Sequence, residues 1–395
     1  MSAKKLRIGI IGCGNIGSGS HLPAWLANAE IAEVAGLADP TAATLEAARE
    51  SAGLSAAQAH ADPLELIARP DIDAIDICTP QHLRRDLILA AAEHGKHVLC
   101  EKPLATVPAD AASAVEAMAA AGPTLAMVHN YLWLPEVRAA QRVVDSGEIG
   151  RVRTATVNFL GIVDVPGSSG YVPRWRHDAA LAGGGVLMDI LHGVYVVESL
   201  LGEPLQRVSA YANNDDPQSN VEDIALCRFE TEANAGLVNI AWGYGPGGLD
   251  VTGTEGRVFS VYRDGGTSPW SPLERVQVTT EAGTRTVLDV SGQNEDDYEA
   301  LRLTFDDVFR DFAAALEAGS SPRASGADGL RILEATVGAL KSAASGQLTE
   351  IPLDRDDPVF ERGIVGVGDL ELPDFSPARR RGLYREPTLG TKEAQ

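Results

Sequence analysis

Six residues near the start of the chain combine flexible glycines with a place between a strand and a helix. They are Gly12, Cys13, Gly14, Asn15, Ile16 and Gly17, directly after the apolar run 6–11. In a G-x-G-x-x-G loop the first glycine permits a tight turn, the second lets the backbone approach a pyrophosphate, and the third lets the next helix pack closely on the strand. The N–H groups at the start of that helix attract phosphate oxygens. The loop therefore predicts a dinucleotide site.

Asp39 stands at the end of a second apolar run, 31–38. A carboxylate in this position can accept hydrogen bonds from the hydroxyl groups of the adenosine ribose. Its neighbours Pro40 and Thr41 provide no arginine for a 2′-phosphate. We therefore predict NAD, rather than NADP, as the cofactor; the alternative is a flexible turn beside a surface aspartate.

Further candidate residues follow two more apolar runs, at the point where each run ends. They are Thr79, Pro80 and His82 after the run 74–78, and Glu101 and Lys102 after the run 97–100. In an open parallel sheet, ligands bind outside the carboxyl ends of the strands. We expect the ammonium group of Lys102 to lie beside the nicotinamide with Glu101 as its charge partner. A cis bond to Pro103 costs little and would fix this turn. Without this context, Lys102 is only a charge on a surface loop.

The elements that position these residues follow from the periodicity. Up to about residue 128, short apolar runs alternate with segments rich in Ala, Leu and Glu at 41–51, 83–94 and 109–120. This βαβα rhythm predicts a doubly wound parallel sheet, the Rossmann fold, over residues 1–129.

The second part of the chain has a different pattern. After a helix at 135–146, runs that alternate apolar and polar residues predict a large, mainly antiparallel open sheet, and two helices are expected at 298–318 and 326–344. We therefore expect a second domain, of the α+β class, over residues 130–353. Residues 354–395 lack clear periodicity and are expected to form an arm or tail.

Several of these motifs together resemble the Gfo/Idh/MocA family, that of glucose–fructose oxidoreductase and inositol dehydrogenase. The most specific is G-K-H-V-x-x-E-K-P within residues 91–105, which accompanies the glycine loop, Asp39 and Thr79-Pro80. Further matches are the segment 145–150, Trp175-Arg176, the segment 183–189 and the segment 328–334. The resemblance covers residues 6–353. It implies a Rossmann domain, a second domain whose open sheet joins subunits, and a nicotinamide-dependent redox reaction at a sugar or cyclitol carbon.

The resemblance also implies three catalytic residues: Lys102, Asp189 and His192. The family usually separates the aspartate and the histidine by four residues, and here they are three apart. Because each residue of a helix turns by about 100°, the shorter spacing rotates the position of the histidine by about that angle. Both spacings still keep the pair on one helical face. We expect His192 to act as the base, Lys102 as electrostatic partner or alternative base, and Asp189 as the residue that orients the imidazole or binds a neighbouring hydroxyl.

Four more residues are candidates for substrate contact. They are Asn130, Tyr131, Trp175 and Arg176. An indole and a guanidinium can stack on a sugar and donate hydrogen bonds to it, although core and rim packing explains the same pair. Likewise, a histidine in an apolar helix is often only a packed residue.

The charge and cysteine content disfavour several classes of protein. The 395 residues carry 33 Lys and Arg against 55 Asp and Glu, a net charge of −22, which disfavours nucleic acid and an anionic membrane as partners. No window approaches the roughly 18 apolar residues of a membrane span. The four cysteines form no C-x-x-C pair, which favours buried thiols in a reducing cytoplasm. His94 and His97 straddle a helix end and a strand, and no metal site is predicted.

Three functions are compatible with these residues. The first is NAD-dependent oxidation of a secondary hydroxyl of a sugar, glycoside or cyclitol by a homodimer or homotetramer. The second is an NAD-dependent glycoside hydrolase that oxidises the sugar, eliminates, adds water and returns the hydride, with His192, Tyr131 or Tyr195 as the extra base. The third is a non-catalytic dinucleotide-binding sensor or regulator. The retained Lys102 favours an enzyme.

The cofactor choice is testable by direct binding. Because no arginine stands beside Asp39 to receive a 2′-phosphate, we expect tighter binding of NAD than of NADP. Fluorescence titration of the protein with both dinucleotides measures the two Kd values. Tighter binding of NADP would overturn the argument from Asp39.

Overall fold

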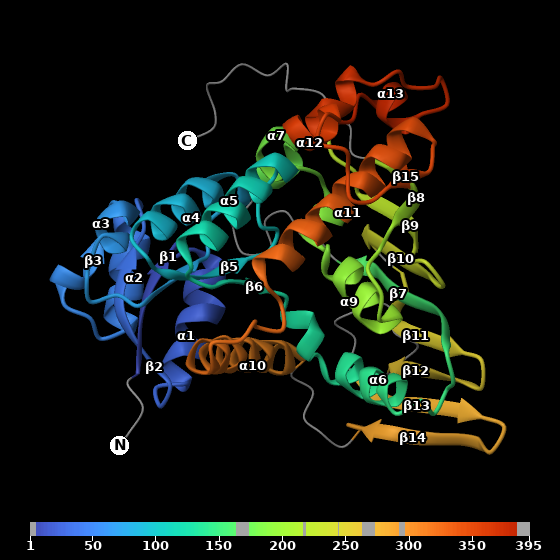
Figure 1. Cartoon of the computed structure of the whole chain (residues 1–395), viewed down its shortest axis with the longest axis horizontal. Helices are drawn as coiled ribbons and strands as arrows, with labels where there is room; N and C mark the ends of the chain where they lie inside the picture. The colour runs from blue at the N-terminus through green and yellow to red at the C-terminus, as the bar shows by residue number, and fades with distance from the viewer. Residues whose placement is uncertain are drawn as a thin grey trace. The chain divides into compact units, whose positions relative to one another are not determined.

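The computed structural model describes residues 5–162, 174–215, 219–243, 245–262, 273–291 and 297–384. These residues form two compact units (Figure 1). Unit 1 contains the residues up to 105 together with 110–130 and 299–330, and unit 2 contains 106–109, 131–298 and the residues from 331 onward. The expected domain division at residue 129 stays a prediction, but the segment 299–330 groups with unit 1.

Unit 1 is built on a parallel sheet. In the described chain it has six strands in the order β3-β2-β1-β4-β5-β6. The strands are β1 (Leu6–Ile11), β2 (Ala32–Ala38), β3 (Ala59–His60), β4 (Ala74–Ile77), β5 (His97–Glu101) and β6 (Leu125–Val128). Every residue of β4 and β6 is buried, as expected where helices cover both faces. The strand order reverses between β1 and β4, the place where such sheets bind ligands. The predicted Rossmann fold is confirmed.

The helices of unit 1 connect these strands or cover them, and the first two residues of α5 and of α10 belong to unit 2. They are η1 (Gly17–His21), α1 (Leu22–Ala27), α2 (Ala42–Ser51), η2 (Ala56–Gln58), α3 (Pro63–Ile67), η3 (Gln81–Leu83), α4 (Arg84–Glu93), α5 (Pro108–Ala121) and α10 (Asp297–Ala318). The periodicity located α2, α4, α5 and α10 to within a few residues. The last of these comes late in the chain, and its Phe309 stacks on Trp25 of α1 with ring centroids 4.1 Å apart.

Unit 2 contains the predicted, mainly antiparallel sheet. Among the described residues it has nine strands, in the order β14-β13-β12-β11-β7-β10-β9-β8-β15. They are β7 (Val152–Ile162), β8 (Arg207–Asn213), β9 (Ile224–Glu230), β10 (Ala235–Trp242), β11 (Gly247–Gly253), β12 (Gly256–Tyr262), β13 (Leu273–Thr280), β14 (Gly283–Asp289) and β15 (Thr349–Glu350). Only the pair β7 and β10 is parallel among these described strands. Burial alternates along β9, so one face of the sheet is covered.

Short and long helices complete unit 2 (Figure 1). They are η4 (Asn130–Trp133), α6 (Pro135–Asp145), η5 (Arg174–His177), α7 (Ala179–Ala182), α8 (Val186–Asp189), α9 (His192–Leu201), α11 (Gly326–Ser345), α12 (Pro358–Arg362), η7 (Gly363–Asp369) and α13 (Pro377–Arg381). Two of these elements, η4 and α11, begin in unit 1. Helix α9 lies on β7 and β10, and a Cβ on its Gly193 would come within 2.8 Å of Val238. The glycine therefore lets this helix approach the sheet closely.

The C-terminal segment differs from the expected arm. It contains the short helices α12, η7 and α13, and Phe360, Ile364 and Tyr384 are buried. Helices of five to seven residues have too few turns for a periodic pattern, so the sequence did not predict them. Residues 385–395 lie outside the described part of the chain.

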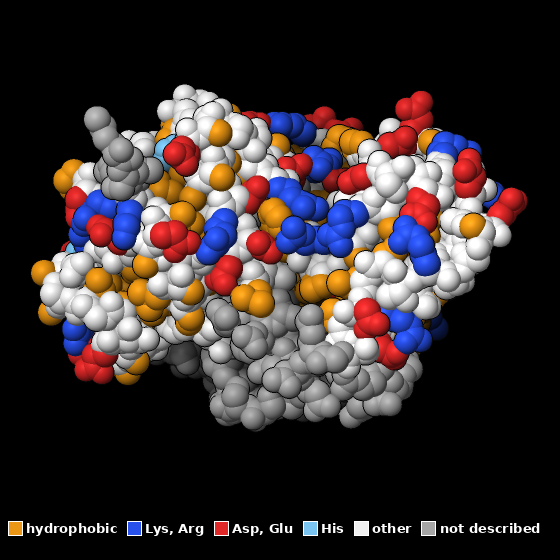
Figure 2. Space-filling view, turned by 90° about the horizontal axis from the view of Figure 1, so that it is seen from below, with side chains coloured by type: hydrophobic (Ala, Val, Ile, Leu, Met, Phe, Trp, Pro, Cys, Tyr) orange, Lys and Arg blue, Asp and Glu red, His pale blue; other side chains and the backbone are white. Residues whose placement is uncertain are grey.

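Two surface properties bear on partners. No single helix in the described chain has the length and apolar content to cross a bilayer, and the bent pair 179–189 and 192–201 meets that test only when both halves are counted together. Figure 2 shows basic side chains interspersed with acidic ones on one face of the molecule.

Candidate active site

The glycine loop follows β1 as predicted, and its three glycines have different roles. Gly12 has a φ of +93°, and a Cβ there would lie 2.9 Å from the carbonyl carbon of Cys78. A Cβ on Gly17 would lie 2.0 Å from the Gly12 carbonyl oxygen, whereas one on Gly14 would meet no atom of the described residues within 4 Å. Packing therefore requires the first and third glycines, and the second leaves its side of the loop open to a ligand.

Asn15 and Ile16 form the exposed tip of this loop and begin a helical run over residues 15–27. The part of this run that forms η1 is π-helical, which the sequence did not predict. The hydroxyl of Ser18 donates a hydrogen bond to the carbonyl oxygen of Cys13 (2.7 Å). This hydrogen bond holds the loop, while the side chains of Asn15 and Ile16 at its tip stay exposed.

Asp39 is buried and fixes the end of β2 against the loop. Its Oδ2 accepts a hydrogen bond from the N–H of Cys13 and its Oδ1 one from the N–H of Thr41, each at 2.8 Å. A carboxylate oxygen has two lone pairs, so both oxygens can still accept a ribose hydroxyl. Asp39 thus suits the predicted ribose contact and also has a structural role that the sequence did not reveal.

A buried arginine that the sequence analysis missed holds the loops after β4 and β5. The guanidinium of Arg84 donates hydrogen bonds to the carbonyl oxygens of Thr79 (2.7 and 2.9 Å), Glu101 (2.5 Å) and Pro103. The hydroxyl oxygen of Thr79 is inaccessible and has no hydrogen-bond partner among the described residues. An inaccessible hydroxyl without a partner beside Pro80 suits a ligand contact. His82 is exposed on η3.

Glu101 and Lys102 lie where β5 ends, and the bond from Lys102 to Pro103 is cis. The Oε2 of Glu101 accepts the main-chain N–H of Lys102 (2.9 Å), and its Oε1 lies 3.1 Å from the Nε2 of His21. Burial alone would raise the pKa of Glu101, but the hydrogen bond and charge of His21 and the charges of Lys102 and Arg84 hold that pKa below its ordinary value. Glu101 is therefore a carboxylate that holds the lysine's main chain.

In unit 2, three glycines and one carboxylate shape the segment that leads to Asp189. Gly183 and Gly184 have φ values of +74° and +152°, and a Cβ on Gly185 would lie 2.0 Å from the carbonyl oxygen of Glu222. The carboxylate of Glu222 accepts hydrogen bonds from the N–H groups of Gly185 (2.9 and 3.0 Å) and Leu187 (3.0 Å). These bonds satisfy N–H groups at the start of α8, which no preceding turn can pair.

Asp189 and His192 do not share one helix, in contrast to the expectation. Asp189 ends α8, His192 begins α9, and the chain bends by 47° between the two segments. The angular argument from their three-residue spacing therefore does not apply. The Oδ1 of Asp189 lies 3.5 Å from the Nη1 of Arg176, which makes this arginine its ion-pair partner.

The imidazole of His192 is buried and held by two tyrosines. Its Nδ1 lies 2.5 Å from the hydroxyl oxygen of Tyr195, and that hydroxyl accepts the main-chain N–H of Tyr131 (3.1 Å). The rings of His192 and Tyr131 stack with centroids 3.8 Å apart. Tyr195 thus holds the imidazole at Nδ1, and the expected role of Asp189, to orient the imidazole or to bind a neighbouring hydroxyl, stays a prediction. The three-residue helical spacing from His192 to Tyr195 was the available signal.

The other predicted substrate residues fall in different places. Trp175 and Arg176 lie on η5, with the guanidinium carbon of Arg176 5.5 Å from the indole centroid. Asn130 is buried in unit 1, where its side-chain amide donates to the hydroxyl of Thr304 (3.1 Å), whereas Tyr131 belongs to unit 2. The structure therefore assigns these adjacent residues to separate units.

These features define the class of protein. A parallel sheet with this strand order, a glycine loop after its first strand, an acid after its second and a lysine after β5 form the cofactor domain of a dinucleotide-dependent oxidoreductase. A family model described as "Oxidoreductase family, NAD-binding Rossmann fold" matches residues 6–129, and the GFO/IDH/MocA C-terminal domain matches residues 137–259. The chain belongs to the Gfo/Idh/MocA family of oxidoreductases. The predicted family and NAD cofactor are confirmed.

Relatives of known activity act on sugars. The chain is 30% identical to 1,5-anhydro-D-fructose reductase of Ensifer adhaerens over 292 residues, which are 73% of this chain and 82% of that protein. It is 26% identical to D-apiose dehydrogenase of Paraburkholderia graminis over 89% of this chain and 91% of that protein. The crystal structure of aldose-aldose oxidoreductase from Caulobacter crescentus, complexed with glycerol, superposes with a TM-score of 0.74 and 25% identity over 88% of this chain and 100% of that one.

Gly14 and Gly17 offer a matched pair of substitutions. Gly14→Ala places a methyl group in open space, so we expect the free energy of unfolding to change by less than about 0.5 kcal/mol while NAD affinity falls. Gly17→Ala forces a methyl group against the Gly12 carbonyl, and we expect a loss of about 1–3 kcal/mol. Urea unfolding and NADH fluorescence titration measure the two quantities. Equal losses of stability in both variants would contradict the assigned roles.

Glu222 makes stability depend on pH. Burial raises its pKa from 4.5 to about 7, although the hydrogen bonds from Gly185 and Leu187 act in the opposite direction. The folded state therefore keeps a proton that the unfolded chain loses at lower pH. This stabilisation is complete below about pH 4.5 and is lost as the pH rises through about 7. At about 1.4 kcal/mol per pKa unit, the loss is about 3 kcal/mol at most.

Glu222→Gln keeps an acceptor for both N–H groups and cannot ionise. We therefore expect the urea midpoint of this variant to change less between about pH 5 and pH 8 than that of the unchanged protein. Glu255→Gln, at an exposed position, is the control and should keep the original slope. Burial also raises the pKa of Glu334 to about 7. The urea midpoint of every variant therefore keeps part of its dependence on pH. Identical slopes in the two variants would rule out Glu222 as a source of the pH dependence.

Proposed function

We propose that the protein oxidises a secondary hydroxyl group of a sugar, glycoside or cyclitol and transfers the hydride to NAD. The observation that carries this proposal is the fixed imidazole of His192, whose Nδ1 contacts Tyr195 and whose ring stacks on Tyr131. Histidine suits the transfer of a hydroxyl proton near neutral pH. The sugar substrates named for the relatives support the substrate class.

Bound NAD supplies the hydride acceptor, and the side chains manage the proton and the charge. In the tautomer in which Nδ1 donates to Tyr195, the Nε2 of His192 is the basic nitrogen that removes the hydroxyl proton. The oxygen of Tyr195 can accept this bond together with that from the Tyr131 N–H, because a phenol oxygen has two lone pairs. Lys102 stabilises the negative charge that develops on the substrate oxygen, or serves as the alternative base.

The remaining assignments follow the geometry within each unit. Asp189, whose Oδ1 lies 3.5 Å from Nη1 of Arg176, binds a neighbouring substrate hydroxyl or orients the imidazole. Trp175 and Tyr131 offer aromatic faces to a sugar ring. Asn130 keeps its amide oxygen for a substrate contact, since its amide nitrogen donates to Thr304.

We assign the cofactor to unit 1. The open side of Gly14 leaves room for the pyrophosphate, Asp39 receives the ribose, and the partnerless hydroxyl of Thr79 gains a ligand. The proposed contacts are Gly12, Gly14, Asn15, Ile16, Gly17, Asp39, Thr79, Pro80, His82, Glu101 and Lys102. They lie at the carboxyl ends of β1, β2, β4 and β5.

The proposal also includes the assembly and the compartment. The sheet of unit 2 exposes Tyr211, Leu226 and Leu237, and Tyr211 and Leu226 are directly opposite each other on β8 and β9. These apolar side chains support a homodimer or homotetramer formed through the sheet. All four cysteines are buried and unpaired, which supports a reducing cytoplasm.

A substrate screen with two readouts tests the proposed reaction. Sugars, glycosides and inositols are incubated with NAD, and NADH absorbance and aglycone release are both followed. We expect NADH to form with at least one secondary alcohol. Aglycone release without net NADH would instead identify the hydrolase, and NAD binding without either product would identify a sensor.

Substitutions then test the two catalytic assignments. We expect Lys102→Ala and His192→Asn to lower kcat by about 100-fold or more while NAD still binds. The exposed Lys5→Ala is the control and should keep normal kcat. Near-normal turnover of Lys102→Ala with bound NAD would overturn the scheme.

A further inference from the structure

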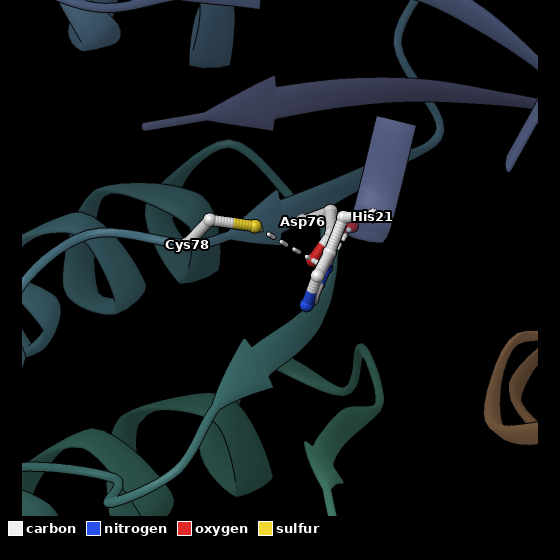
Figure 3. A group of neighbouring side chains, drawn as sticks. All are labelled: His21, Asp76 and Cys78. Carbon is white, nitrogen blue, oxygen red and sulfur yellow. Dashed lines mark hydrogen bonds and ion pairs between the residues drawn. The ribbon is translucent and has the colours of Figure 1, made fainter. Parts of the chain in front are cut away.

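A buried histidine in unit 1 connects the glycine loop with the loop that carries Lys102. His21 is the last residue of η1, and its side chain has no exposed surface. Its Nδ1 lies 2.8 and 3.0 Å from the two carboxylate oxygens of Asp76, and its Nε2 lies 3.1 Å from Oε1 of Glu101. Figure 3 shows the ring of His21 directed at Asp76, with Cys78 on the other side of that carboxylate.

The two acids lie on one face of the sheet because of the strand register. Asp76 of β4 pairs with Leu99 of β5, and Glu101 stands two residues further along β5, on the same face as Leu99. The indole N–H of Trp25 donates to Oδ2 of Asp76 (2.7 Å), and the thiol of Cys78 lies 3.7 Å from Oδ1. Both oxygens of each carboxylate are therefore engaged.

The geometry determines the charge of His21. A neutral imidazole has one N–H donor, so one ring nitrogen would direct its lone pair at a carboxylate. Only the imidazolium donates to both acids. Burial alone would lower the pKa of His21, but the charge of Asp76 and the hydrogen bond to it raise that pKa well above its ordinary value.

The surroundings of the imidazolium contain few other charges. Cys78 is a buried thiol whose pKa burial raises, so it acts as a neutral donor. From α10, the rings of Phe305 and Phe309 contact His21, at centroid distances of 5.1 and 5.3 Å. The cations Arg84 and Lys102 act on Glu101.

The same atoms do not form a convincing metal site. His21, Asp76 and Cys78 bring possible ligand atoms within 4.8 Å of one another. However, both ring nitrogens of His21 already face carboxylates. The Oδ2 of Asp76 accepts a hydrogen bond from the indole N–H of Trp25, and an N–H donor in this place would repel a cation. The hydrogen-bond network explains this arrangement more completely.

We propose that His21 is a positioning residue for Lys102, acting through Glu101. This inference rests on the proposed function, in which Lys102 stabilises the substrate oxygen. One oxygen of Glu101 is held by the imidazolium and the other holds the main-chain N–H of Lys102. His21 thereby fixes the carboxylate that fixes the lysine's backbone. It also balances the charge, since His21, Asp76 and Glu101 together carry one net negative charge.

Loss of the imidazolium would leave two buried carboxylates without their shared cation. They would repel each other, and Glu101 would lose the contact that holds it toward Lys102. The extra negative charge would also favour protonated forms of the neighbouring groups. The lost contact would change the position of Lys102, and the extra charge would change its protonation. The glycine loop keeps its own hydrogen bonds.

A charge-balanced pair of substitutions tests this proposal. His21→Gln should lower kcat by about 10- to 100-fold, as misplacement of a catalytic group does, with little change in KM for NAD, and should move the kcat–pH profile to higher pH. In the double variant with Asp76→Asn, the cluster again carries one negative charge. We expect it to recover much of the kcat and the original pH profile. A double variant no better than His21→Gln would overturn the charge-balance argument.

Phe305→Leu is the matched control because Phe305 packs on the same ring without a polar contact. It should lower stability without shifting the pH profile. If Phe305→Leu shifts the pH profile as much as His21→Gln does, His21 is only a packed residue and the proposal is wrong.

A measurement on the unchanged protein separates this inference from the proposed function. Nitrogen-15 NMR of histidine-labelled protein, with His21 assigned from its absence in His21→Gln, reports the protonation of both ring nitrogens. We expect an imidazolium at about pH 8, where a histidine of ordinary pKa, about 6.5, is neutral. A neutral ring at that pH would overturn the proposal. An imidazolium in a protein that oxidises no alcohol would refute only the proposed function.

Discussion

The proposed chemistry depends on one buried cation, Arg84, which holds the carboxyl ends of two strands of the parallel sheet. Carbonyl groups at the end of a strand have left the ladder and need other partners. In unit 1, the carbonyls of Thr79, Glu101 and Pro103 all accept hydrogen bonds from one guanidinium, whose donors point in fixed directions. The loops after β4 and β5 are thereby joined, and Lys102 stands between two of the three anchored residues.

Unit 2 has backbone N–H groups, rather than carbonyls, that need partners. They stand at the start of α8, and the buried carboxyl group of Glu222 accepts hydrogen bonds from them. The main chain approaches Glu222 so closely that Gly185 cannot carry a side chain. A guanidinium thus binds carbonyls at the strand ends of one unit, and a carboxyl group binds N–H groups at a helix start in the other. In both cases one buried polar side chain holds the backbone that carries a proposed catalytic residue.

The sequence predicted those parts that depend on local order. Strands such as β1 and helices such as α2 follow a clear hydrophobic pattern, and the glycine loop stands directly between a strand and a helical run. The missed parts depend on contacts between distant residues. Arg84 is the first residue of a helix with several charges, and only the fold shows that it is buried. Tyr195 accepts a hydrogen bond from the main-chain N–H of Tyr131, which lies 64 residues earlier in the chain. The break between α8 and α9 likewise has no proline to announce it.

Helix α10 completes a unit that begins almost 300 residues earlier in the chain. Its Phe305 and Phe309 cover the buried ring of His21, and Phe309 also stacks on Trp25. During synthesis, the apolar surface of unit 1 is therefore fully buried only after the segment 299–330 has left the ribosome. A fragment that ends after β6 would lack Phe305 and Phe309, and we expect the rings of His21 and Trp25 then to be exposed to water. The cofactor domain would therefore not fold stably from the first 130 residues alone.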